Sequence, residues 1–332
     1  MTVAAQSSSP PTRSPGETKG LPSRPYPGYV PAYPESASFI CGYNRGYKLK
    51  VFCTYNIHYG VGSDGKYDVA RIADTVAEAD IVCLQEAVSG WPQNGFADQT
   101  AEIASRLNRY HWYHGAMESD ASEVGADGRI VNRRRSFGNA VISRWPITWA
   151  RGHLLPKTAL VDRFDLQRGF VEASIATPAG PLRVYSVHLS HVGPQQRLPQ
   201  VRALMETVLN AERVGATWDS AAGSTFMFQE RRPDVSRSAI LAGDFNFTPA
   251  HPEYPLVCGE TSYYGRLGTT MHLADAWAAA GNSEEEVDSF PREGRIDHVF
   301  VTHDLTPKVK KAWIGYGIVA SDHWPVFVEF DL

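Results

Sequence analysis

Polar side chains recur along this chain at the points where short apolar segments end. Such positions present many active-site side chains, because a folded core holds the segment while its end reaches solvent. Carboxylates, amides and imidazoles gathered there could bind a hard cation, move a proton and stabilise negative charge. The residues that follow or interrupt these segments are Asn56, Glu86, His188, Asp244, Asn246, Asp297, His298, Asp322 and His323.

Taken singly, each of these residues has a simpler structural explanation. Asn56 could complete a turn, and Asp244 with Asn246 could form an Asx turn. Glu86 could cap a loop, and a lone histidine such as His188 is commonly a hydrogen-bonded core residue. The recurrence of the pattern along one chain favours a shared functional explanation.

The segments that must position these residues show a mixture of strand and helix patterns. We expect strands at 50–55, 80–85, 138–143, 170–176, 182–188, 238–242, 296–301 and 326–330. We expect helices at 68–79, where Asp68 is suited to capping, and at 98–107 and 198–211. The mixture fits two packed sheets flanked by helices, although the pattern alone leaves an ordinary α/β fold open.

The composition is that of a folded globular protein. The 332 residues are 43% hydrophobic and carry a net charge of −4, which argues against wholesale disorder and against binding polyanions by bulk positive charge. A local basic groove stays open. Four cysteines without a CxxC pair suggest neither a disulfide scaffold nor a zinc knuckle. We find neither a membrane-spanning apolar run nor a secretory signal in the first 30 residues, so we expect a cytoplasmic protein.

The first 36 residues differ from the rest of the chain. They contain eight of the 22 prolines and almost no aliphatic side chains. We interpret residues 1–36 as a disordered or wrapping tail and residues 37–332 as a single domain.

Several short motifs occur in one order along the chain. They are Thr54-Tyr55-Asn56-Ile57-His58, Leu84-Gln85-Glu86, Gly138-Asn139-Ala140-Val141-Ile142-Ser143, Val187-His188-Leu189, Gly243-Asp244-Phe245-Asn246, Arg295-Ile296-Asp297-His298 and Ser321-Asp322-His323-Trp324-Pro325-Val326. This ordered set resembles the endonuclease/exonuclease/phosphatase superfamily, the deoxyribonuclease-I-like group of metal-dependent phosphohydrolases, from about residue 48 to 332. The resemblance implies a four-layered α/β sandwich of two packed mixed sheets flanked by helices.

The resemblance also implies a divalent-metal site. Glu86 would be the principal ligand, helped by Asn56 and Asp322. Oxygen ligands of this kind suit Mg²⁺ or Mn²⁺, which would act as a Lewis acid on the phosphoryl and leaving oxygens.

The remaining motif residues would move protons and hold the phosphate. His323 is the candidate general base, and Asp297 would fix its tautomer and raise its basicity. By the same resemblance Asp244 orients the attacking water, while Asn246 and His188 donate to phosphoryl oxygens. His298 stands where many relatives carry an aromatic residue, and we interpret it as a strand residue.

Other residues are candidates for substrate contact. Arg168 precedes a strand and would contact a phosphate or the scaffold, or else pair with Asp162 or Asp165. Asn139, in the 138–143 strand, is a further candidate.

Two stretches are longer than the motifs require. Residues 115–137 are expected to form a loop near the site rim, where Arg133 and Arg135 could contact phosphate or be a solvated surface. Residues 212–237 combine aromatic and basic side chains and could cover the site, grip a substrate, contact a subunit or pack locally.

These observations predict a divalent-metal-dependent hydrolase of phosphate esters, acting on a phosphodiester or phosphomonoester of a small molecule or lipid head group. A deoxyribonuclease-like or repair-type nuclease is the alternative within the enzyme class, with nucleic acid the less favoured partner. A non-catalytic binding module would have lost residues such as Glu86, Asp244 or His323, yet all are present. The sequence leaves the oligomeric state open.

Overall fold

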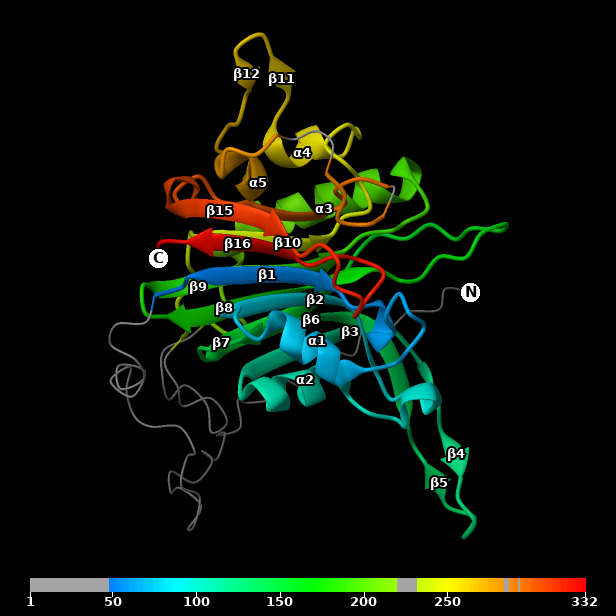
Figure 1. The fold of residues 1–332 in the computed structure, drawn as a ribbon. Coiled ribbons are helices and arrows are strands. Elements are labelled where there is room, and N and C mark those ends of the chain that lie inside the picture. The colour runs from blue at the N-terminus through cyan, green and yellow to red at the C-terminus, as the bar shows by residue number, and fades with distance from the viewer. Residues whose placement is uncertain (1–47, 220–231, 284–286, 292) are drawn as a thin grey trace, which may run out of the picture. The chain divides into compact units, whose positions relative to one another are not determined.

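A computed structural model describes residues 48–219, 232–283, 287–291 and 293–332. Two six-stranded sheets dominate these residues (Figure 1). The first has the order β15-β16-β1-β2-β6-β3, with bounds Val309–Ile314, Val326–Phe330, Val51–Asn56, Ile81–Ser89, Arg134–Ser143 and Tyr110–Asp120. The second has the order β13-β14-β10-β9-β8-β7, with bounds Ala274–Asp275, Asp297–Val301, Ala239–Asp244, Gly180–His188, Gly169–Thr177 and Ile147–Leu154.

Both sheets are mixed in strand direction. β1 runs parallel to β2, and β10 runs parallel to β9, while the other neighbours within the two sheets are antiparallel. Because β1, β2, β9 and β10 are buried almost throughout, they read as near-continuous apolar runs in the sequence. This is why their ends were predictable.

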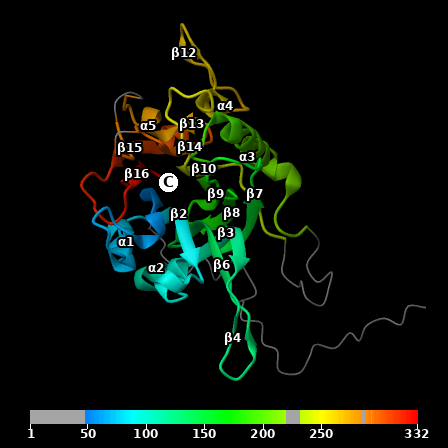
Figure 2. The same ribbon diagram turned by 90° about the vertical axis from the view of Figure 1, so that its right-hand side faces the viewer.

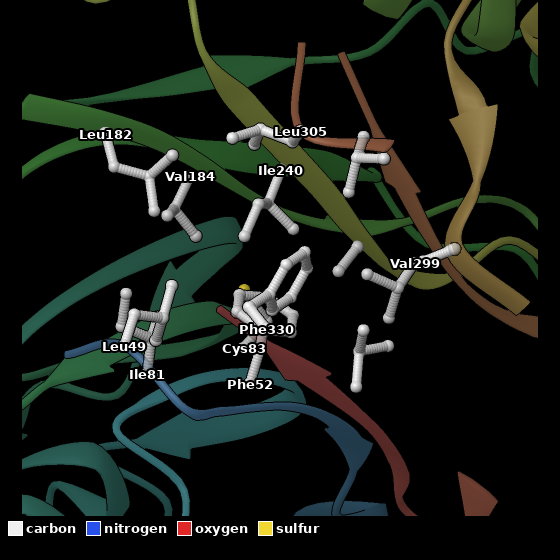
Figure 3. Close-up of a cluster of buried hydrophobic side chains, with 14 of the residues drawn as sticks. Leu49, Phe52, Ile81, Cys83, Leu182, Val184, Ile240, Val299, Leu305 and Phe330 are labelled. Carbon is white, nitrogen blue, oxygen red and sulfur yellow. The ribbon is translucent and has the colours of Figure 1, made fainter. Parts of the chain in front are cut away.

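The two sheets pack face to face across an apolar core (Figure 3). Phe52 and Cys83 from the first sheet meet Val184, Ile240 and Val299 from the second in one buried cluster. Burial of apolar surface at roughly 25 cal/mol per Å² makes such a core the main stabilising contribution to the fold.

Helices cover the outer face of each sheet, which completes four layers. Ile72 on α1 (Val69–Val76) and Ile103 on α2 (Gln99–Leu107) share a buried cluster with Leu84 of the first sheet. Leu204 on α3 (Pro194–Val214) shares another with Leu241 of the second. The remaining short helices are α4 (Tyr254–Cys258) and α5 (Ala276–Ala279), with 3₁₀ turns at His58–Gly60, Pro92–Asn94 and Thr306–Lys308.

The predicted helices and strands are present within a few residues of their expected bounds. Asp68 caps α1, as predicted, because its carboxylate accepts hydrogen bonds from the backbone N–H groups of Ala70 and Arg71. The two-sheet alternative is therefore the observed fold, and the four-layered sandwich is confirmed.

The expectation of a loop at 115–137 is wrong. β3 and β6 extend into this stretch from its two ends, and β4 (Glu123–Val124) pairs with β5 (Ile130–Val131) to close the ribbon (Figure 2). The exposed, charged side chains of this ribbon hide the apolar alternation by which strands are recognised. A second hairpin joins β11 (Thr261–Ser262) to β12 (Gly265–Arg266).

Two predictions fall wholly or partly outside the described residues. The proposed 1–36 tail lies outside them, and so do residues 220–231 of the 212–237 stretch. Within the described chain, no helix combines the length and hydropathy required to cross a membrane.

Candidate active site

Seven of the predicted site residues line one cavity of about 500 Å³: Glu86, Arg168, His188, Asp244, Asn246, Asp322 and His323. Its lining includes His188 and Asp244, which end β9 and β10, and Glu86, which lies near the end of β2. Its lining residues are His58, Tyr59, Glu86, Phe137, Phe164, Leu166, Arg168, His188, His191, Asp244, Asn246, Phe290, Glu293, Ile296, Asp322 and His323.

Glu86 enters the cavity from an irregular point in β2. The register between β2 and β6 shifts between Leu84 and Ala87, and Glu86 adopts a φ of 59°. Left-handed backbone is unfavourable for a residue with a Cβ and is typical of functional positions that the surrounding fold enforces. The bulge turns the Glu86 carboxylate toward Asn56, whose Nδ2 donates to Glu86 Oε1 at 3.3 Å.

Asn56 joins the two sheets across the cavity floor. Its Nδ2 also donates to Asp244 Oδ2 at 2.9 Å and lies 3.4 Å from His323 Nε2. Ser321 holds Asn56 from behind, since the Ser321 hydroxyl donates to the Asn56 backbone carbonyl at 2.8 Å. One buried amide thus brings together side chains that come from three distant parts of the sequence.

His323 and Asp297 form a buried hydrogen-bonded pair. His323 Nδ1 lies 2.9 Å from Asp297 Oδ2, and Asp297 in turn is fixed through its backbone N–H, which donates to Ser289 Oγ at 2.9 Å. Burial lowers the pKa of His323, but the adjacent Asp297 carboxylate, reinforced by Asp244, raises it to about 10. The His323 Nε2 atom lies 3.8 Å from Asp244 Oδ2, so the imidazole sits between two carboxylates.

Asp244 is buried among groups that have opposite effects on its pKa. Burial and the neighbouring Asp297 carboxylate raise its pKa to about 7, although His323 and the hydrogen bond from Asn56 act to lower it. His188 Nε2 lies 3.3 Å from Asp244 Oδ2. The site therefore holds more negative charge than its histidines balance at neutral pH.

Arg168 supplies the positive charge on the other side of His188. Its Nη1 lies 3.0 Å from His188 Nδ1, and its Nη2 lies 3.1 Å from His191 Nδ1. Among the described residues this guanidinium forms no salt bridge with Asp162 or Asp165, although the charge of Asp165 favours its protonated form. Burial lowers the pKa of Arg168, although Glu86 and Asp244 oppose the shift.

Three other predicted residues, Asn246, Asp322 and Asn139, differ in how they contribute to the cavity. Asn246, at a φ of 53°, lines the cavity and donates through Nδ2 to the Leu189 carbonyl at 3.1 Å. Asp322 lines the rim, 3.7 Å from His58 Nδ1. Asn139 is buried below the cavity and donates to the Gly169 carbonyl at 2.7 Å, which gives it a structural contact.

Arg133 and Arg135 are not among the residues that line the cavity. Arg133 pairs with Glu123 at 3.0 Å and lies over the Phe96 ring, while Arg135 Nε donates to Ser119 Oγ at 2.7 Å. The ribbon thus satisfies these arginines internally.

His298 is a core residue, consistent with its interpretation as a strand residue. Its Nε2 lies 2.7 Å from the Phe247 carbonyl, and its ring stacks on Phe300. Burial, together with the charge of Arg295, lowers its pKa to about 3.

Sequence reasoning missed several residues that line the cavity. His58 and Tyr59 both have positive φ values, of 42° and 43°, and enter from the turn after β1. His191, Phe164 and Glu293 come from loops, where no periodic pattern marks them. The motif Thr54–His58 contained the only sequence signal for this group.

The donor set fits a divalent cation. Asp244, Asp297 and His323 offer ligand atoms within 4.8 Å of one another, and Glu86 adds a carboxylate to the same cavity. Burial raises the pKa of Glu86, and Asp297 Oδ1 is buried without a hydrogen-bond partner in the described chain. Surplus buried carboxylate of this kind is what a hard cation would neutralise.

The chain belongs to the endonuclease/exonuclease/phosphatase family, whose sequence profile matches residues 53–323. This family is generally hydrolytic, acts on phosphate esters and depends on divalent metal ions. No curated protein matches the chain closely enough to count as a relative.

Solved structures share the fold at low sequence identity. An endonuclease/exonuclease/phosphatase from Beutenbergia cavernae is similar with a TM-score of 0.55 and 22% identity, covering 85% of this chain and 71% of its own. A family protein from Leptotrichia buccalis has a TM-score of 0.54 and 17% identity, and the match covers 85% of this chain and 100% of the Leptotrichia protein. ANGEL2, described as a 2′,3′-cyclic phosphatase, has a TM-score of 0.52 and 12% identity, and the match covers 85% of this chain and 94% of ANGEL2.

Proposed function

We propose that this protein is a divalent-metal-dependent hydrolase of phosphate esters and that its substrate is a small molecule or a lipid head group. The observation that carries the proposal is the joining of His323, Asp297, Asp244 and Asn56 by hydrogen bonds or close contacts on the floor of one cavity. Every member of this set is buried, so its geometry is held by the fold.

His323 is the general base in this proposal. Asp297 accepts from Nδ1 and so leaves Nε2 to face the attacking water, which Asp244 orients. In the free site the raised pKa keeps the imidazole protonated at neutral pH, and positive charge entering the site would lower that pKa. His323 can therefore accept a proton from water at neutral pH only when a cation occupies the site.

Glu86 would hold the cation, with Asn56 and Asp322 contributing oxygen atoms beside it. Bound Mg²⁺ or Mn²⁺ would supply Lewis-acid stabilisation of the phosphoryl and leaving oxygens. His188, Asn246 and, more remotely, Arg168 are placed to donate to phosphate oxygens as their charge grows.

The charge of the cavity lining supports a small substrate over a nucleic acid. Arg168 is the one lysine or arginine among the described lining residues, whereas Glu86, Asp244, Glu293 and Asp322 carry carboxylates. An extended polyanion requires several cations along a groove. The arginines of the β4–β5 ribbon do not provide them here, since acidic and hydroxyl neighbours engage them.

A substrate panel tests this function. The panel contains 4-nitrophenyl phosphate, its bis ester, phosphoinositides, sphingomyelin, nucleotides and DNA, each assayed with EDTA and with Mg²⁺ or Mn²⁺ restored. We expect turnover of a small or lipid ester that EDTA abolishes and metal restores, with DNA left intact. Metal-dependent DNA cleavage, lost in His323→Ala, would replace the proposal with a nuclease.

A further inference from the structure

The guanidinium of Arg168 is buried and forms no salt bridge with a carboxylate among the described residues. Its side chain is 5% exposed, its hydrogen bonds go to the imidazoles of His188 and His191, and its Nε atom has no partner in the described chain. Buried cations are normally paired because removing a charge from water is costly. Glu86, Asp244 and Asp165 offset part of this cost without forming a salt bridge, and an anion in the cavity would give Arg168 a direct partner.

Arg168 also fixes the proton of His191. A guanidinium only donates, so His191 Nδ1 must accept the bond from Arg168 Nη2 at 3.1 Å. In the neutral imidazole the proton is then on Nε2, which becomes a donor. Burial and the charge of Arg168 both lower the pKa of His191, which favours that neutral form.

His188 lies between Arg168 and the catalytic floor. Arg168 Nη1 is 3.0 Å from its Nδ1 and 2.9 Å from its Nε2, and Nε2 is also 3.3 Å from Asp244 Oδ2. Arg168 and His191 therefore place two hydrogen-bond donors beside His188 in the cavity lining.

Arg168, His188 and His191 line the cavity of about 500 Å³, and two of them also border a second, much smaller hollow. A separate hollow of about 10 Å³ adjoins Arg168 and His188, walled by Phe137, Gly138 and Gly169. It has room for no more than about one water molecule. The wall is tightly packed, since a Cβ on Gly138 would lie 1.8 Å from the His114 carbonyl oxygen.

We propose that Arg168 and His191 form an anion subsite beside the phosphoryl centre and that it selects phosphomonoesters over phosphodiesters. This inference rests on the proposed hydrolase function and specifies its substrate class. A monoester presents a third terminal oxygen and a second negative charge, which these two donors receive. A diester would direct an uncharged ester arm at the same donors and leave the guanidinium unpaired.

The test compares two esters that share a leaving group, 4-nitrophenyl phosphate and bis(4-nitrophenyl) phosphate. Wild-type protein is expected to have the higher kcat/KM on the monoester. His191→Ala is expected to reduce the monoester kcat/KM by about tenfold, the loss of one hydrogen bond to a charged group, and to leave the diester value within about twofold.

Two further variants separate recognition from structure. His191→Gln restores an acceptor for Arg168 and an N–H donor, so it is expected to recover most of the monoester activity. His111→Ala removes an exposed histidine from β3 outside the cavity lining and is expected to match wild type. Equal losses on both esters, no loss on the monoester, or no recovery in His191→Gln would each overturn the subsite.

Binding provides a readout that does not require turnover. Calorimetry is expected to show tighter binding of methyl phosphate than of dimethyl phosphate, with the difference removed in His191→Ala. Selective binding without hydrolysis of any panel ester would refute the hydrolase and keep the subsite. Hydrolysis with equal affinity for the two phosphates would refute the subsite and keep the hydrolase.

Discussion

Replacing Asp297 with asparagine should lower the pKa of His323. The two side chains are 2.9 Å apart and both are buried, so at an effective dielectric constant of about 20 their attraction is about 6 kcal/mol. That energy corresponds to about four pKa units, comparable to the rise of the His323 pKa from 6.5 to about 10. Because burial and the remaining charge effects persist, the Asp297→Asn variant should titrate below pH 7.

The assay is a pH titration of the histidine ring signals by NMR on EDTA-treated protein, with His323 assigned by its absence in His323→Gln. In wild type the His323 ring should stay protonated up to about pH 10. Ser289→Ala is the matched control, since it removes the hydroxyl behind Asp297 and keeps the carboxylate. The same midpoint in wild type and Asp297→Asn would show that Asp297 does not set the charge of His323.

Three other results are expected. Glu86→Gln should raise the Mg²⁺ concentration for half-maximal thermal stabilisation by at least about tenfold, and an unchanged titration would remove Glu86 from the ligands. The pKa of His323 is raised in the folded state, so the stability that His323 adds relative to His323→Gln should be full below about pH 6.5 and lost as the pH rises through about 10. Urea unfolding measures this. A difference in unfolding free energy between the two proteins that stays constant across this range would contradict the pairing. Gly243→Ala should destabilise the protein by about 3 kcal/mol or more, because its Cβ would lie 1.9 Å from the Val187 carbonyl oxygen, and a wild-type melting temperature would refute that close approach.

The central strands of the fold were predictable because both of their faces are buried. Residues 81–84 and 239–242 are continuous apolar runs followed within two positions by a polar residue, and the structure places them in β2 and β10. The catalytic floor followed from the same signal, since Asp244 ends β10 and Glu86 interrupts the apolar run of β2. Their types and their order along the chain carried the resemblance to the family.

The outer strands and the cavity walls were less predictable. β3 is exposed or half-buried at all but one of its positions, and β15 carries the exposed Lys310 and Lys311, so neither shows an apolar run. Arg168 could be linked to phosphate by its type, but its partner His191 is in a loop and meets it only through the tertiary fold. The bulge that turns Glu86 into the site arises from β2–β6 pairing, which local sequence does not encode.

The central claim is that water attacks phosphorus in this cavity, with His323 as the base. The direct measurement is hydrolysis of the preferred phosphate ester in ¹⁸O-labelled water with Mg²⁺ or Mn²⁺, followed by mass spectrometry of both products. The label is expected in the phosphate product, and His323→Ala is expected to slow its appearance by at least about a hundredfold without loss of fold. Label in the alcohol product, or an unchanged rate in His323→Ala, would contradict the account.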